Sequence, residues 1–131
     1  QLRGELIMGK KVMVVDDSKF MYEEIKFFLN KSEFEVVGYS KDGEGAVACY
    51  DQCMPDVVTM DIVLPGIDGF EASAEILKVH PDAKIIVVSS LAYDDTMTRA
   101  TEIGAKGFLF KPIEKALLLE ALSKVFEEEN A

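Results

Sequence analysis

The sequence has few of the residues that build disulfide or zinc sites. It holds two cysteines, one histidine and no tryptophan. Cys49 and Cys53 lie four residues apart with no third cysteine, and His80 stands alone, so neither a disulfide framework nor a zinc site can be assembled. We therefore expect both cysteines to be reduced residues of a helix.

A basic stripe and a long apolar run are also missing. The formal net charge is -10, and lysines and arginines occur singly or in pairs, so no row of cations is present to neutralise nucleic-acid phosphates. No apolar run approaches the roughly 20 residues that cross a bilayer, and no signal-peptide pattern occurs. We expect a cytoplasmic protein that binds neither nucleic acid nor membrane directly.

The composition is otherwise typical of one globular domain. The chain has 131 residues, of which 49% are hydrophobic and 29% charged, enough to bury a single core. Met8 and Gly9 resemble a natural start, so residues 1–7 are expected to be a remnant of expression or a disordered N-terminus. Residues 8–131 then form the domain.

Five short β-branched runs recur along the chain, and a helical pattern follows each. The expected strands are 11–15, 35–39, 56–60, 84–89 and 107–110. Helical spacing joins Met21, Ile25 and Leu29 in the first helix, and Leu118 and Leu122 in the last. Such alternation favours a parallel sheet with helices on both faces. We predict an α/β fold, the flavodoxin-like doubly wound (βα)5 type, with strand order 2-1-3-4-5.

Local signals refine this outline. Asp68 with Glu71 three residues later predicts the start of a helix, and Gly104 predicts the end of one. Phe27, Phe28 and the methionines are predicted to lie in the core.

Chemically active side chains are expected where the strands end. Ligands of open parallel sheets bind beyond the carboxyl ends of the strands, where strand order reverses. The polar residues that end or follow the strands there are Asp16, Asp17, Asp61, Ser89 and Lys111. In the predicted order the first and third strands are neighbours, so the three carboxylates converge and need a cation or a proton. Mg²⁺ is expected, because it prefers oxygen ligands and accompanies phosphates.

The same residues suit phosphoryl transfer. Asp61 beside Mg²⁺ can attack phosphorus and form an aspartyl phosphate, while the metal offsets charge on the phosphoryl oxygens. Lys111 supplies a positive charge for one oxygen and Ser89 a hydroxyl donor for another. Backbone N–H groups after Asp61 can donate further hydrogen bonds.

Four short motifs lie at the ends of the expected strands. They are Asp16-Asp17-Ser18, the segment Met60 to Gly69, Ser89-Ser90 and Lys111-Pro112. Each alone is common, but the four in this order are specific, and together they resemble the receiver domain of bacterial response regulators in two-component signalling. The resemblance covers residues 11 to about 126 and implies that 8–131 is a receiver domain.

The resemblance implies a role for each acidic residue. Asp61 is the phosphorylated residue. Mg²⁺ is bound by Asp17, Asp61 and the backbone carbonyl of Val63, and Asp16 acts largely through water.

The resemblance also implies a conformational switch. The peptide bond between Lys111 and Pro112 is expected to be cis. Ser89 moves toward the phosphoryl group, and Phe108 turns into the space that Ser89 leaves, which is a two-state packing change that phosphorylation can bias.

The implied function is a binding switch, not an enzyme acting on other molecules. A histidine kinase or phosphotransfer protein supplies the phosphoryl group, and an output protein binds the face formed by the helix at 94–103, the strand at 107–110 and the last helix. A stand-alone regulator of the chemotaxis type is expected first. The alternative is a receiver cut from a larger regulator with transcriptional or methylesterase output.

Three other classes remain as alternatives. A phosphatase of the haloacid dehalogenase class also forms an aspartyl phosphate but needs Asp-x-Asp after the first strand, whereas Asp16 and Asp17 are adjacent. A flavin-binding domain of the same topology needs a hydroxyl- and glycine-rich phosphate loop there. A degenerate receiver that only binds partners is disfavoured, because every chemical position is filled.

Overall fold

The computed structural model describes residues 9–91 and 94–130. The strands are β1 (Lys10–Val15), β2 (Phe34–Ser40), β3 (Val57–Asp61), β4 (Ile85–Ser89) and β5 (Gly107–Phe110). The helices are α2 (Lys19–Leu29), α3 (Ala46–Cys53), α4 (Gly69–Val79), α5 (Asp94–Glu102) and α6 (Lys115–Asn130). Each strand lies within one residue of its predicted bounds. The boundary expected after residue 7 lies outside the described residues.

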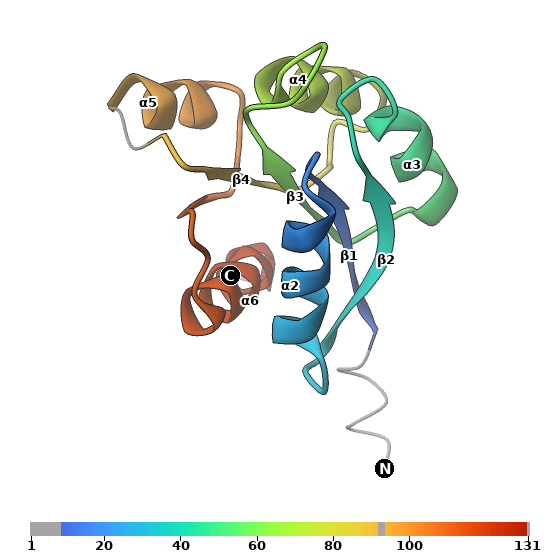
Figure 1. Cartoon of the computed structure of the whole chain (residues 1–131), viewed down its shortest axis with the longest axis vertical. Coiled ribbons are helices and arrows are strands. Elements are labelled where there is room, and N and C mark those ends of the chain that lie inside the picture. The colour runs from blue at the N-terminus through green and yellow to red at the C-terminus, as the bar shows by residue number, and fades with distance from the viewer. Residues whose placement is uncertain (1–8, 92–93, 131) are drawn as a thin grey trace.

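The five strands form one parallel sheet in the order β2-β1-β3-β4-β5. Helices α2 and α6 cover one face of this sheet, and α3, α4 and α5 cover the other (Figure 1). The predicted flavodoxin-like doubly wound fold is therefore confirmed. Strand β1 lies between β2 and β3, with Val15 paired with Met60, so the strand order reverses at the carboxyl ends of β1 and β3.

Each face of the sheet has its own apolar cluster. Alternate residues of β1 point to opposite faces: Val12 and Val14 pack with α2 and α6, whereas Met13 and Val15 pack with α3, α4 and α5. All four side chains are buried. Strands covered on both faces must be apolar on both, which explains why the central strands are nearly continuous runs of valine, isoleucine and methionine.

The prediction that Phe27 and all the methionines lie in the core was wrong. Phe27 is 75% exposed, and Met54 and Met97 are also exposed. Phe27 follows Ile25 by two positions, which on a helix places it about 200° around the axis from that buried residue. Phe28 packs at the edge of the core, and Met13 and Met60 are fully buried.

Helix ends follow the predicted signals. The Asp68 side chain accepts a hydrogen bond from the backbone N–H of Glu71 (2.9 Å) and so caps α4. Gly104 has a φ of 91°, the left-handed conformation expected after α5. Cys49 and Cys53 are free thiols of α3, as predicted. Within residues 9–91 and 94–130, no helix is both long and apolar enough to cross a membrane.

Candidate functional site

Three aspartates meet at the carboxyl ends of β1 and β3. Asp16 and Asp17 follow β1, and Asp61 is the last residue of β3. One carboxylate oxygen from each residue lies within 4.8 Å of the others. Asp16 and Asp61 are buried, whereas Asp17 is exposed. The convergence predicted from strand order is therefore present, and the acidic group has one side open to solvent.

The loop after β5 brings a cation to this acidic group. The Lys111 ammonium lies 3.0 Å from Oδ2 of Asp16 and 3.3 Å from Oδ2 of Asp61. The backbone N–H of Lys111 donates to the carbonyl of Ser89 (2.9 Å), which ties this loop to the end of β4. The Lys111–Pro112 bond is cis, as the resemblance implies. A single lysine thus faces two buried carboxylates.

Burial and charge raise the pKa of Asp61 to about 6. Desolvation is the largest cause and the negative charge of Asp16 the next, and together they outweigh the opposing effect of Lys111. For Lys111, burial alone would lower the pKa, but the hydrogen bond to Asp16 and the charges of Asp61 and Asp16 raise it. Lys111 therefore stays protonated. Its single positive charge does not neutralise all the negative charge of the three carboxylates.

Ser89 and Phe108, the two residues expected to form the switch, occupy neighbouring strands. Ser89 is fully buried, and its hydroxyl oxygen accepts a hydrogen bond from the backbone N–H of Leu91 (2.9 Å). Phe108 is half-buried against the cluster that includes α3, α4 and α5, and its ring lies 4.9 Å from that of Phe110. Their coupled movement stays a prediction.

The loop after Asp61 presents Val63 to solvent. Its side chain is 58% exposed, and the neighbouring Leu64 is buried. Gly69 closes this loop by donating its N–H to the carbonyl of Ile62 (2.8 Å). A Cβ at Gly69 would overlap the carbonyl oxygen of Asp61, so α4 can start here only with glycine. The sequence predicted a helix start at Asp68 but not the contact between Gly69 and the backbone of Asp61, the candidate phosphoacceptor.

An aromatic pair that sequence reasoning also missed joins α2 to the end of β2. The rings of Tyr22 and Tyr39 stack with centroids 4.2 Å apart. Burial is the largest cause of a raised pKa at Tyr39, and the charges of Asp16 and Asp17 add to it. Tyr39 therefore lies close enough to the acidic group for the charges of Asp16 and Asp17 to act on its hydroxyl.

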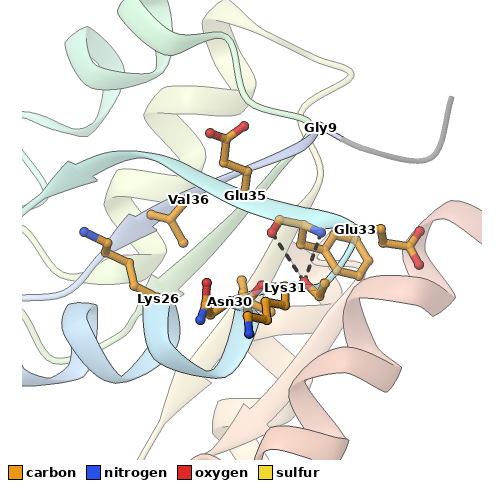
Figure 2. Close-up of a pocket in the computed structure, with 10 residues that line it drawn as sticks. Gly9, Lys26, Asn30, Lys31, Glu33, Glu35 and Val36 are labelled. Carbon is orange, nitrogen blue, oxygen red and sulfur yellow. Dashed lines mark hydrogen bonds between the residues drawn. The ribbon is translucent and has the colours of Figure 1, made fainter. Parts of the chain in front are cut away.

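A hollow of about 430 Å³ lies at the opposite end of the sheet, near the start of β2 (Figure 2). Its charged lining residues are Lys26, Lys31, Glu33 and Glu35. The Ser32 hydroxyl bonds to both the N–H and the carbonyl of Phe34 beside it. Opposite charges are mixed in this lining, and it contains none of the residues at the ends of β1, β3 and β5.

The chain is similar to known proteins over most of its length. A family model for the response regulator receiver domain matches residues 12–123. Chemotaxis protein CheY of Thermotoga maritima is 42% identical over 118 residues, which cover 90% of this chain and 98% of that protein.

Solved structures agree with the sequence matches. In the CheX-CheY-BeF3-Mg²⁺ complex from Borrelia burgdorferi, a chain superposes with a TM-score of 0.86 at 30% identity, covering 91% of this chain and 90% of that chain. The response regulator domain of Thermotoga maritima CheB gives a TM-score of 0.79 at 35% identity, covering 92% of this chain and 96% of that one.

Proposed function

This chain belongs to the response-regulator receiver domain family, as a domain of the CheY type, and we propose that it is switched by phosphorylation of Asp61. The observation that carries the proposal is the group of three aspartates faced by Lys111. Members of this family are signalling switches and not enzymes in the usual sense. We infer that the only reactions catalysed are its own phosphorylation and dephosphorylation.

The donor set fits a magnesium ion. Three carboxylates within 4.8 Å are hard oxygen ligands, and Lys111 brings only one positive charge to this group. We propose that Asp17, Asp61 and the Val63 carbonyl hold Mg²⁺, and that Asp16 acts largely through water. When bound, Mg²⁺ supplies positive charge that offsets the charge on the phosphoryl oxygens.

The residues of the site have separate tasks in phosphoryl transfer. Above about pH 6 the Asp61 carboxylate is ionised, and one of its oxygens forms a bond to phosphorus. With a phosphohistidine donor, the phosphorus–nitrogen bond breaks and its electron pair stays on the imidazole nitrogen. The Lys111 ammonium then pairs with one phosphoryl oxygen.

Ser89 is prepared to donate a hydrogen bond to the phosphoryl group. Its oxygen already accepts the N–H of Leu91, so its own hydroxyl proton remains for a second bond. We propose that the Ser89 hydroxyl donates a hydrogen bond to a phosphoryl oxygen and that Phe108 moves into the space that Ser89 leaves. Phe108 adjoins a hollow next to α5, lined also by Met97 and Ala100, in which such a movement has room.

The output partner is proposed to bind the face of α5, β5 and α6. Three large apolar side chains of these elements are exposed: Met97, Phe110 and Leu117. A hollow of about 550 Å³ beside β5 and α6 is lined by Phe108, Phe110 and Leu117. Phe108 therefore links the proposed switch to this surface. The alternative form of output is a transcriptional or methylesterase domain attached to the receiver. The proposed phosphoryl donor is a histidine kinase or phosphotransfer protein.

Phosphorylation is tested by intact mass after incubation with acetyl phosphate. Wild-type protein is expected to gain one phosphoryl group with Mg²⁺ and none with a chelator. Asp61→Asn is expected to gain none, whereas Asp82→Asn, which changes an exposed aspartate before β4, is expected to behave as wild type. A phosphoryl group on Asp61→Asn would contradict the assignment of Asp61 as the phosphorylated residue. If wild-type protein gains no phosphoryl group, the alternative of a receiver that binds partners without being phosphorylated is favoured.

A further inference from the structure

Glu44, an exposed residue of the turn between β2 and α3, reaches the loop that follows Asp61. Its Oε2 accepts a hydrogen bond from the backbone N–H of Ile67 (2.9 Å). The two residues are 23 positions apart in the chain, so no local pattern connects them. We propose that Glu44 is a positioning residue that holds the 62–68 loop in the geometry needed for Mg²⁺ binding, an inference that rests on the proposed function.

The packing around this hydrogen bond shows that the two loops fit closely. Gly66 has a φ of 76°, and a Cβ there would overlap the Glu44 carboxylate, so the absence of a side chain leaves room for it. In the other direction, a Cβ at Gly43 would lie 2.7 Å from Cγ1 and 3.0 Å from the carbonyl oxygen of Ile67. Glycines at both points allow the backbone of one loop to touch the other.

The turn that carries Glu44 is itself tied to the first acidic loop. The backbone N–H of Asp16 donates to the carbonyl of Ser40 (3.1 Å). The Ser40 hydroxyl donates to the carbonyl of Asp42 (2.7 Å), and an Asp42 carboxylate oxygen accepts the N–H of Gly45 (2.8 Å). Residues 40–45 therefore connect the backbone at Asp16 with the loop after Asp61.

The hydrogen bonds of residues 40–45 therefore reach both loops that carry the proposed metal ligands. Asp17 and Asp61 lie on different loops, and the Val63 carbonyl belongs to the segment that Glu44 holds. At the ends of that segment, Ile62 donates its N–H to Val88 (3.2 Å) and accepts the N–H of Gly69 (2.8 Å). Glu44 adds a further restraint within the loop, at Ile67. Loss of the hydrogen bond at Ile67 should let the Val63 carbonyl, which lies in the same loop, move more freely. Weaker Mg²⁺ binding follows, because ordering the loop then opposes binding.

Two substitutions at Glu44 separate its hydrogen bond from its charge. Glu44→Ala removes both, whereas Glu44→Gln keeps an amide oxygen that can accept from Ile67 but carries no charge. Glu75→Ala is the matched control, because Glu75 is exposed and lines the same hollow as Glu44 and Ile67. It removes one negative charge from the same surface without removing the hydrogen bond to the loop.

The test is a calorimetric titration with Mg²⁺, combined with amide hydrogen exchange at Ile67 measured by NMR. Glu44→Ala is expected to bind Mg²⁺ about three- to tenfold more weakly than wild type and to exchange the Ile67 amide about tenfold faster, as loss of one solvent-exposed hydrogen bond implies. Glu44→Gln and Glu75→Ala are expected to stay within about twofold of wild type. Unchanged thermal unfolding would show that the fold is kept.

The outcomes distinguish this inference from the proposed function. If wild type binds Mg²⁺ and Glu44→Ala binds it as well as Glu75→Ala does, the positioning role is overturned and the phosphorylation switch stands. Equal weakening in Glu44→Gln and Glu44→Ala would show that charge and not the hydrogen bond matters, which also overturns it. Wild-type protein that binds no Mg²⁺ would overturn the proposed function together with this inference.

Discussion

Replacing Asp61 by asparagine is expected to stabilise the metal-free protein at neutral pH. Asp61 is only 4% exposed and lies close to Asp16, so its ionised form has lost water and gained repulsion. Asparagine has nearly the same shape and no charge. The substitution therefore removes the cause of the raised pKa while leaving the packing at the end of β3 intact.

The size of the effect follows from the pKa of Asp61. Its ordinary value of 3.8 and its value of about 6 in the fold differ by an amount that corresponds to about 3 kcal/mol. Because the folded protein holds this proton more tightly than the unfolded chain, wild-type stability falls as the pH rises from about 4 to about 6. In the variant, Lys111 keeps its ion pair with Asp16 but loses the one with Asp61, which offsets part of this effect. We therefore expect the free energy of unfolding to rise by about 1–3 kcal/mol.

Urea unfolding followed by far-ultraviolet circular dichroism measures this gain, and the chain has no tryptophan for fluorescence. The advantage of Asp61→Asn should be full above about pH 7 and vanish below about pH 3, where Asp61 of wild type is protonated in both states. Added Mg²⁺ should stabilise wild type and narrow the difference. Equal or lower stability of the variant at neutral pH, or a difference independent of pH, would refute the reasoning. Asp82→Asn serves as the control.

Two further predictions concern buried backbone and side-chain contacts. The Thr59 hydroxyl is buried and finds no hydrogen-bond partner among the described residues, so Thr59→Val should raise the free energy of unfolding by about 1 kcal/mol, whereas the exposed Thr98→Val should not. No gain in urea unfolding would argue that Thr59 is hydrogen-bonded. Gly69→Ala should cost about 1–3 kcal/mol and reduce phosphorylation, because its Cβ would push against the Asp61 carbonyl. Gly107→Ala, whose Cβ would lie 3.5 Å from Ile86, is its control, and equal losses in the two variants would contradict this account.

The sequence alone predicted the strands, the start of α4, the end of α5 and the three carboxylates of the site. These features depend on local patterns: β-branched runs bounded by polar residues mark the strands, and Asp68 marks the start of α4 through its own side chain. The alternation of strand and helix then limits the topology so strongly that Asp16 and Asp61 must end neighbouring strands. A residue that follows a strand is thus assigned to the site by its position in the chain.

Only the tertiary structure decided how these groups act on one another. The raised pKa of Asp61 depends on its burial and on the distance to Asp16. Lys111 pairs with both Asp16 and Asp61, and the sequence does not predict which carboxylates it contacts. The hydrogen bond from Ile67 to Glu44 joins loops with no shared periodicity. Burial and long-range contacts depend on how all the elements pack together, whereas sequence patterns report only what lies within a few residues.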